Sequence, residues 1–180
     1  MQYVAFFRGI SPANPAMSNK KLMEVCSSFG FEKIWTVLSS GNVLFETRSS
    51  QAKTFETKIE NALKKQLGLT TTVIIRSLQQ IQQLVKRDPF QGMVDSGMIR
   101  LNVTFLKDKP HTDTSFPYQS SEKTFCVLGI CDGAVCSIVD LAGARTPDLM
   151  IWLEKEFGSQ ITTRRWNTVL KILASFQEQS

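Results

Sequence analysis

The residues best suited to bind a ligand lie near the end of the sequence, in TTRRWNTVLKIL (162–173). Apolar residues recur three and four apart from Trp166 onward, which predicts a helix beginning upstream of Trp166, with a threonine as its cap. Arg164 and Arg165 would then lie in the first turn, where the helix dipole disfavours a cation by about 0.3–1 kcal/mol. Free amides, hydroxyls and a guanidinium make an anion site; the alternative is an arginine paired with a distant acidic side chain. The candidate residues here are Thr162, Arg164 and Asn167.

Two further segments place polar residues at the ends of predicted strands. In FFRGIS, an arginine ends an apolar run and a glycine lets the backbone turn or approach a ligand closely. In SSGNV, hydroxyl, amide and backbone donors gather at a sharp corner. Turn formation explains the same residue types, because glycine and asparagine tolerate the left-handed region and serine caps locally. Both interpretations stay open for these candidate ligand-binding residues: Arg8, Gly9, Ser40, Gly41 and Asn42.

The sequence contains no recognisable catalytic or metal-binding motif. Cys126, Cys131 and Cys136 are each five residues apart, which is not the paired spacing that zinc sites favour. The single histidine, His111, lies near Asp113 in a polar loop and is interpreted as a solvated residue in preference to a catalytic dyad. Phosphate-binding glycine loops, nucleophile elbows and HExxH motifs do not occur. We therefore expect no metal and no cofactor, and the sequence identifies no catalytic residue.

Composition is that of an ordinary globular protein. The chain has 180 residues, 42% hydrophobic and 21% charged, with a net charge of +5 and a pI near 9.1. This charge permits an anionic partner, either a small ligand or a nucleic acid. The basic residues are nevertheless scattered and interleave with glutamates, a pattern typical of a solvated helix face and not of a nucleic-acid stripe. The interleaved residues are Lys53, Glu56, Lys58, Glu60, Lys64 and Lys65.

Segments that direct or anchor a protein are not recognisable. No stretch approaches the ~18 uninterrupted apolar residues that span a bilayer. MQYVAFFRGI has no basic region or cleavage-like site, so we expect a strand there and not a signal peptide. Four cysteines are too few for a disulfide scaffold in a chain of this length. Reduced thiols, a cytoplasmic location and no membrane partner are therefore expected, while the oligomeric state has no signal in the sequence.

Alternating strand and helix patterns position the candidate residues of the first half. Strands are expected at 3–10 and 70–77, and a pair of strands at 33–46 around the Ser-Gly-Asn corner. Helices are expected from a cap at Ser18 to Gly30, and from a serine cap near residue 50 to Gly68. The order strand–helix–strand–strand–helix–strand over residues 1–76 is that of a ferredoxin-like βαββαβ fold.

Residues 77–180 are expected to form a second α+β half. A helix at 78–87 precedes a strand at 100–108 and a strand pair, 123–130 and 134–140, that turns at 131–133. A helix capped by Thr146 and ending at Gly158 precedes the final helix. Because no interdomain linker separates the halves, we expect residues 1–180 to pack as a single compact α+β unit.

Three segments carry a family resemblance. FFRGI near the start, SSGNVLFE about thirty residues later and TTRRWNTVLKIL at the end resemble, in this order and spacing, the domain-of-unknown-function 1697 (DUF1697) family of mostly bacterial proteins. The resemblance covers nearly the whole chain and implies a two-part α+β fold with a ferredoxin-like first half. It implies no activity, because the family has no established biochemical function. The matching residues are Arg8, Gly9, Ser40, Gly41, Asn42, Thr162, Arg164, Trp166, Asn167 and Thr168.

The chain departs from the family pattern at three places. Residues 11–14, Ser-Pro-Ala-Asn, replace a frequent Asn-Val-Gly-Gly loop, and Arg165 replaces the usual asparagine. GARTPDL stands where many members have Gly-Arg-Ser-Lys-Leu. The favoured function is a small module that binds an anionic molecule. The alternatives are a nucleic-acid-binding protein, which the absence of RNP-type aromatic residues disfavours, and an enzyme of unknown reaction.

Overall fold

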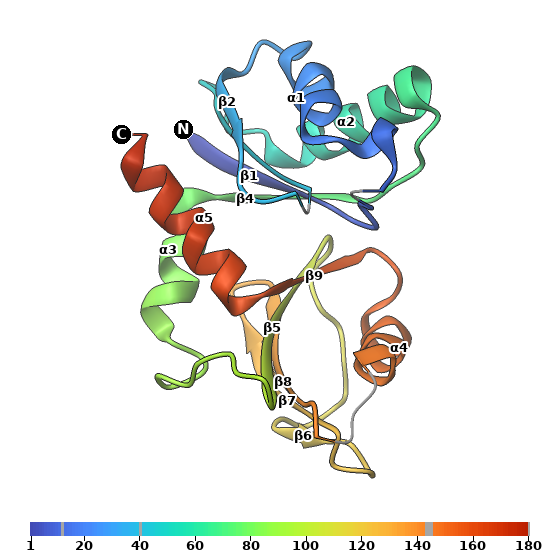
Figure 1. Ribbon diagram of the computed structural model, residues 1–180, viewed down its shortest axis with the longest axis vertical. Helices are drawn as coiled ribbons and strands as arrows, with labels where there is room; N and C mark the ends of the chain where they lie inside the picture. Colours follow the sequence, from blue (N-terminus) through green and yellow to red (C-terminus); the bar gives the residue numbers. More distant parts are fainter. Residues whose placement is uncertain (12, 40, 143–145, 180) are drawn as a thin grey trace. The chain divides into compact units, whose positions relative to one another are not determined.

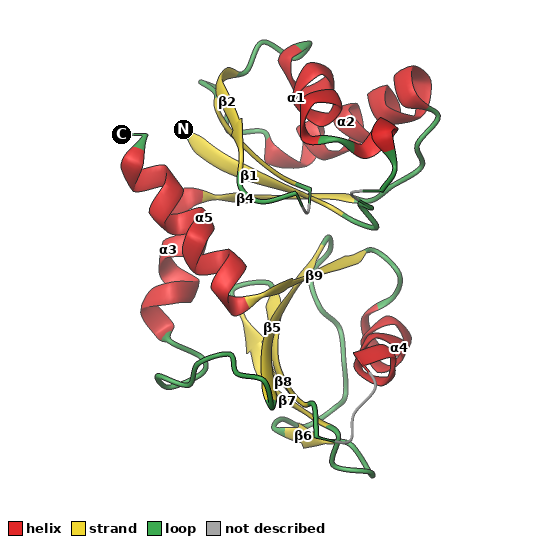
Figure 2. Cartoon of the chain, in the orientation of Figure 1, coloured by secondary structure: helices red, strands yellow, loops and turns green. Residues whose placement is uncertain are grey.

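The computed structural model describes residues 1–180 except 12, 40, 143–145 and 180. The chain divides into two compact units, the first containing Met1–Ile81 and Lys171–Ser180 and the second Gln82–Leu170. Each unit contains one antiparallel sheet and helices, so the protein has a mixed α+β fold (Figure 2). The expected packing of all 180 residues as a single compact unit stays a prediction.

The first unit is built on a four-stranded sheet in which the strand order is β2-β3-β1-β4 and all neighbours are antiparallel. The elements follow the predicted order along the chain. They are β1 (Gln2–Phe7), a 3-10 turn η1 (Pro15–Met17), α1 (Asn19–Ser27), β2 (Glu32–Thr36), β3 (Asn42–Glu46), α2 (Ala52–Leu67) and β4 (Val73–Ser77). Helices α1 and α2 lie on the same side of this sheet (Figure 1).

The core of the first unit lies between these helices and the sheet. Side chains of β1 alternate across the sheet, and Tyr3, Ala5 and Phe7 join the buried cluster that includes helix residues. The rings of Phe31 and Phe45 stack with centroids 4.0 Å apart, and Phe55 from α2 meets Phe31 edge-on at 4.8 Å. Such aromatic pairs add about 0.5–1.5 kcal/mol each beyond the area they bury. The apolar stripe predicted for α2 is therefore the face that packs.

The predicted ends of α1 and α2 are partly confirmed. Ser18 caps α1, its hydroxyl accepting from the Lys21 amide at 3.4 Å, and Gly68 ends α2 in the left-handed conformation. The predicted serine cap of α2 is wrong, because its N-cap is Gln51 and makes no side-chain hydrogen bond. The hydroxyl of Ser49 instead accepts from the Gln51 amide at 3.3 Å. A serine two residues before the cap reaches only the local turn.

The second unit is built on a five-stranded antiparallel sheet with strand order β6-β7-β8-β5-β9. The predicted pair around residues 131–133 is confirmed as a hairpin of β7 and β8. The strands are β5 (Ile99–Leu106), β6 (Tyr118–Gln119), β7 (Phe125–Cys131), β8 (Ala134–Asp140) and β9 (Ile161–Arg165), and the helices of this part of the chain are α3 (Leu78–Arg87), α4 (Thr146–Phe157) and α5 (Trp166–Glu178). The boundaries between the units fall within α3 and α5.

Helix α4 covers one face of the second sheet (Figure 1). Leu149 and Leu153 are buried in a cluster with Val127 and Val135 from the central strands. The ring of Trp152 stacks on Tyr118 with centroids 4.6 Å apart. The predicted end of this helix before Gly158 is confirmed, and the cap predicted at Thr146 involves a side chain outside those described.

Residues 161–165 are the largest departure from prediction. They form strand β9 and not the first turn of a helix, pairing with β5 from Leu106↔Ile161 to Asn102↔Arg165. Isoleucine and threonine are β-branched and suit a strand, and the long-range ladder with β5 gives their backbone groups partners. Helix α5 begins only at Trp166, which is buried as its spacing predicts. Thr162 is therefore not a helix cap, and Arg164 does not lie at a helix N-terminus.

Candidate functional site

The residues predicted from the sequence to bind a ligand are distributed over both units. Arg8, Gly9, Gly41 and Asn42 belong to the first unit, and the three residues from the end of the chain belong to the second. Ser40 lies outside the described residues. The residues of the first unit and those of the second are therefore considered as two separate groups.

Within the first unit, the Gly-Asn corner is held by its own hydrogen bonds. Asn42 is fully buried, and its side-chain amide donates to the Val37 carbonyl at 2.9 Å. Gly41 adopts φ +70° and its carbonyl accepts from the Phe7 amide at 2.9 Å. A Cβ at Gly41 would lie 2.5 Å from Cγ1 of Ile10, so only glycine fits without displacing that side chain. These contacts give both residues a role in the turn.

Arg8 and Gly9 follow β1 directly. The Arg8 amide donates to the Thr72 carbonyl at 2.9 Å, and the Thr71 hydroxyl donates to the Arg8 carbonyl at 2.5 Å. Gly9 is exposed with φ +65° and has open space where a Cβ would lie. Its requirement for glycine is therefore conformational and does not come from close packing.

Arg164 lies on β9, opposite Val103 of β5. Its Nη1 donates to the Thr162 hydroxyl at 2.8 Å and to the Thr163 carbonyl at 2.9 Å. Burial lowers the pKa of the Arg164 guanidinium to about 10, so the side chain stays a cation at neutral pH. Thr162 thus serves Arg164 as an acceptor, while Asn167 is exposed on the first turn of α5.

Arg165 has the acidic partner that one interpretation of the two arginines expected. Its Nε lies 3.3 Å from Oδ2 of Asp95, a carboxylate with only 2% of its side chain exposed. The other oxygen of Asp95 accepts from the Leu101 amide at 2.7 Å. Sequence reasoning missed Asp95 because it lies 70 residues before its arginine in an irregular segment.

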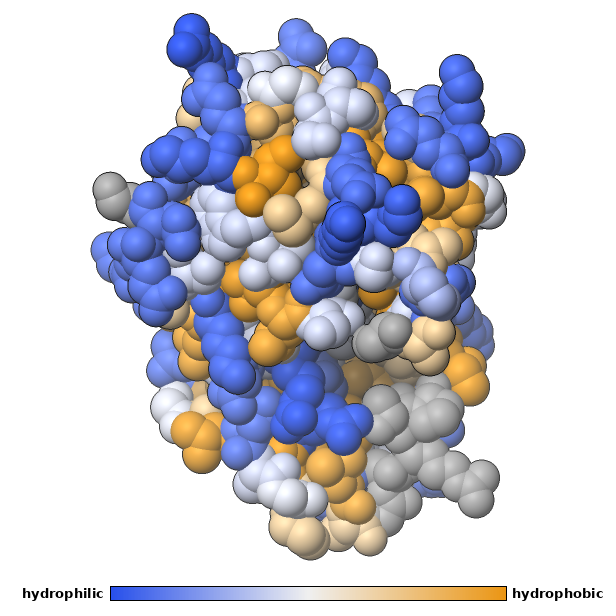
Figure 3. Space-filling model, turned by 45° about the horizontal axis from the view of Figure 1, so that its top comes forward, coloured by the Kyte–Doolittle hydropathy of each residue, from blue (hydrophilic) through white to orange (hydrophobic). Residues whose placement is uncertain are grey.

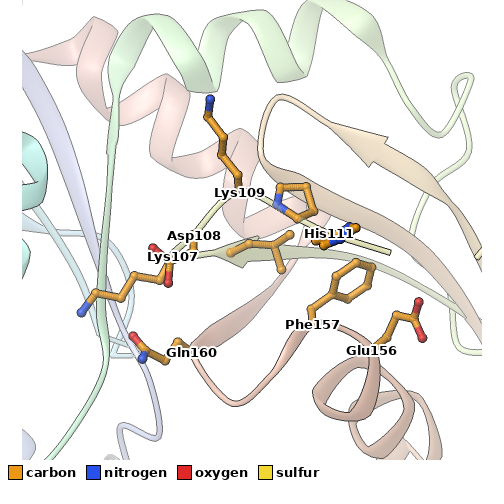
Figure 4. A pocket seen from close by; sticks show the side chains of 9 residues that line it. Lys107, Asp108, Lys109, His111, Glu156, Phe157 and Gln160 are labelled. Carbon is orange, nitrogen blue, oxygen red and sulfur yellow. The ribbon is translucent and has the colours of Figure 1, made fainter. Parts of the chain in front are cut away.

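A hollow of about 190 Å³ lies in the second unit between the loop after β5 and the segment that joins α4 to β9. The Lys107 amide donates to the Gln160 carbonyl at 3.1 Å and ties the two segments together. Figure 4 shows Lys107 and Lys109 extending from the loop in different directions, with His111 beyond them. The lining residues are Leu106, Lys107, Asp108, Lys109, Pro110, His111, Glu156, Phe157 and Gln160.

Glu156 is the acidic side chain that fixes one wall of this hollow. Its Oε1 accepts hydrogen bonds from the hydroxyls of Thr112 and Thr114, the latter at 2.7 Å. Both bonds lower the pKa of the Glu156 carboxyl, so it stays ionised at neutral pH. His111 lines the same hollow as Glu156 and Asp108. Asp113, the partner of His111 considered from the sequence, does not line it. Sequence spacing gave no signal for Glu156, which lies 45 residues after His111.

Residues 1–125 match the model of a family described as "Protein of unknown function (DUF1697)". The chain belongs to this family. The resemblance expected from FFRGI and SSGNVLFE is thereby confirmed. The matched part of the DUF1697 chain contains the loop with Lys107, Lys109 and His111, whereas Glu156 and Gln160 lie beyond it.

One solved structure supports the fold of this DUF1697 chain along nearly its whole length. A conserved bacterial protein, SP0830 from Streptococcus pneumoniae, is similar with a TM-score of 0.66, at 17% identity over 96% of this chain and 97% of that chain. At such low identity the likeness concerns the fold alone. A search of curated proteins found no match to the chain.

None of the helices in the described part of the chain has the length and apolar character required to cross a membrane.

Proposed function

We propose that this DUF1697 protein binds a small anionic molecule in the hollow of its second unit. The observation that carries the proposal is the set of cationic and hydrogen-bonding side chains around that hollow, namely Lys107, Lys109, His111 and Gln160. Lysine carries a compact charge on a flexible stem, so the two ammonium groups can turn toward a bound anion. Apolar contact with the ligand would come from Leu106 and Phe157.

Size and charge narrow the class of ligand. Pockets for drug-sized molecules usually measure about 300–1,000 Å³, and the hollow measures about 190 Å³. This favours inorganic phosphate or a short carboxylate over a nucleotide. Asp108 and Glu156 also line the hollow, and carboxylates accept hydrogen bonds without donating any. A ligand that carries a hydroxyl or amino group beside its negative charge can donate to the carboxylates while its anionic group binds the lysines.

The test is titration of the ¹⁵N-labelled protein with inorganic phosphate, malate and phosphoserine. Binding is expected to shift the amide resonances of Lys107 and Gln160, which both line the hollow and are joined by a hydrogen bond. Lys107→Gln combined with Lys109→Gln is expected to weaken binding by at least about tenfold, since charge-assisted contacts are worth about 1.5–3 kcal/mol each. Lys86→Gln with Lys123→Gln, which removes two charges at exposed positions of the same unit, is the matched control. Unchanged spectra with all three probes would overturn the proposal.

Arg164 is a second candidate anion contact, as the sequence suggested. What supports it is a guanidinium that keeps its charge at neutral pH beside the hydroxyl of Thr162. Asn167 completes this proposed group on the second unit. Arg8 and Gly9 remain proposed ligand contacts of the first unit, where the bonds of Gly41 and Asn42 favour a role in the turn. If Arg164→Gln abolishes the amide shifts seen in the anion titration, the anion binds at Thr162, Arg164 and Asn167 and not in the hollow.

We also propose that the first unit is ferredoxin-like and that the protein is cytoplasmic. The element order and the sheet order β2-β3-β1-β4 support the first proposal. All four cysteines are free, which supports the second.

A further inference from the structure

The charge pattern of α2 has a different meaning in the structure than in the sequence. Lysines and glutamates interleave along residues 53–65, which predicts a solvated face of mixed charge. The glutamates, however, point at β4. Glu56 is 3% exposed and its Oε1 accepts from the Ile75 amide at 2.8 Å. Glu60 accepts in the same way from the Val73 amide at 2.8 Å. Both carboxylates are therefore engaged with the sheet.

The spacing of the two glutamates explains this arrangement. Residues four apart on a helix lie about 6 Å apart along its axis, and residues two apart on a strand lie about 6.6 Å apart. Glu56 and Glu60 consequently match Ile75 and Val73, whose amides face away from β1 because β4 is the edge strand. The half-buried guanidinium of Arg76 also interacts with the charge of Glu56. Capping this edge withdraws both negative charges from the outer face of α2.

The exposed charged side chains in the described part of α2 are all lysines. Among its described residues, every exposed side chain from position 53 to 66 is lysine, threonine, asparagine or glutamine. On α1, Lys20 is exposed and Lys21 pairs with Glu24 at 3.0 Å. We call this surface the basic face, and it comprises Lys20, Lys21, Lys53, Lys58, Lys64 and Lys65 with the polar residues Thr54, Thr57, Asn61 and Gln66.

The net charge of the chain follows the same division. Residues 1–81 and 171–180 contain 11 Lys and Arg against 6 Asp and Glu, a net charge of +5. Residues 82–170 contain 10 of each, a net charge of zero. The whole excess positive charge therefore belongs to the first unit. Figure 3 shows hydrophilic side chains projecting from the surface of this unit, with smaller apolar patches between them.

We propose that the basic face docks on the phosphate backbone of a double-stranded nucleic acid. Lysines supply charge, and threonine, asparagine and glutamine side chains are frequent donors to phosphate oxygens. No large apolar side chain of α1 or α2 is among the exposed ones of the described residues, so the face has nothing to insert into a membrane. Exposed aromatic residues, which single strands require for stacking, are likewise missing from the described α1 and α2. The contact is thus to a duplex and independent of its sequence.

Fluorescence anisotropy with labelled duplex DNA and duplex RNA tests this proposal. If four lysines contact phosphates, the association constant falls about 100-fold between about 50 and 200 mM salt, and changing the base sequence has little effect. Lys58→Glu with Lys65→Glu is expected to weaken binding more than about tenfold at low salt, because two contacts become repulsive. Circular dichroism melting checks that the variant is folded.

The matched control is Lys86→Glu with Lys155→Glu, which makes the same change of net charge at exposed helix positions of the second unit. This control is expected to change the affinity less than about threefold, since only long-range charge is altered. Equal losses in both variants, or binding that does not respond to salt, would overturn the proposal. Tighter binding to vesicles of phosphatidylcholine and phosphatidylglycerol than to either duplex would assign the basic face to a membrane surface instead.

Discussion

Each unit buries a carboxylate that accepts from a strand amide and interacts electrostatically with an arginine, but the two arginines differ in their access to water. In the first unit, Glu56 bonds the Ile75 amide, and burial lowers the pKa of Arg76 while the charge of Glu56 opposes this shift. In the second, Asp95 bonds the Leu101 amide and pairs with an arginine, Arg165, whose side chain is 50% exposed. The half-buried Arg76 depends more on the charge of its carboxylate, whereas the exposed Arg165 can turn to solvent.

The comparison also explains where the charge of the protein resides. The first unit uses two of its six acidic residues to bond strand β4, and its surface keeps the lysines. The second unit has equal numbers of acidic and basic residues, and several of its carboxylates engage hydroxyls or arginines at the surface. The basic pI of the chain, near 9.1, therefore results from the excess of lysine and arginine in the first unit.

The largest expected effect comes from removing Glu56. Glu56→Leu leaves the buried Ile75 amide without its acceptor and removes the negative charge that acts on Arg76, whose Nη1 keeps its bond to the Ile75 carbonyl. We expect this to cost about 3–5 kcal/mol of unfolding free energy. Glu56→Gln keeps an acceptor for the Ile75 amide but loses the negative charge. Its unfolding free energy should fall between those of the wild type and Glu56→Leu. Urea unfolding measures both, with the exposed Glu24→Gln as control. If Glu56→Leu lowers the unfolding free energy by less than about 1 kcal/mol, the value typical of an exposed pair, the proposed difference between the two units is contradicted.

A smaller effect is expected from the matching change in the second unit. Asp95→Ala removes the acceptor of the Leu101 amide, which costs about 1–3 kcal/mol when that group is left unsatisfied. The freed Arg165 adds little, because its half-exposed side chain can be solvated. The same urea experiment checks the order of the two variants. If Asp95→Ala proves as costly as Glu56→Leu, exposure of the arginine is not what separates the units.

The smallest effect is expected at Glu156 and depends on pH. Its pKa lies below the ordinary value of 4.5 because two threonine hydroxyls stabilise the charged form. A folded-state pKa below the unfolded one stabilises the protein above the unfolded pKa, and this contribution disappears as the pH falls through the folded pKa. The Tm difference between wild type and Glu156→Gln should therefore be present at pH 7 and vanish in acid. Melting curves across this range, with the exposed Glu122→Gln as control, test it. A difference that persists in acid would show that packing and not charge is responsible.

Much of the fold was predictable because local signals and tertiary contacts agree. Ser18 and Gly68 mark helix ends by side-chain and backbone chemistry that acts over a few residues. The stripe with Phe55 and Ile59 has the helical period that burial requires. Residues 161–165 were wrongly predicted because two threonines before an apolar run satisfy the rules for a cap, while pairing with β5 depends on a strand about sixty residues earlier.

The candidate site was less predictable for the same reason. Sequence motifs directed attention to Asn42 and Arg164, and both residues have hydrogen bonds within their own turn or strand. The hollow is lined by residues from distant segments, among them His111 and Glu156, and no sequence pattern connects these two. Residues distant in sequence share a pocket only when the chain between them folds back.

The sequence alone determined the mixed α+β class, most helix and strand positions, and membership of the DUF1697 family, because periodicity, caps and turn residues are local properties. Only the tertiary structure decided which way Glu56 and Glu60 point and that residues 161–165 form a strand. Glu56 and Glu60 can lie on the inner margin of α2 because the edge strand β4 offers the Ile75 and Val73 amides as donors. That long-range match turns an apparently balanced helix into a basic face.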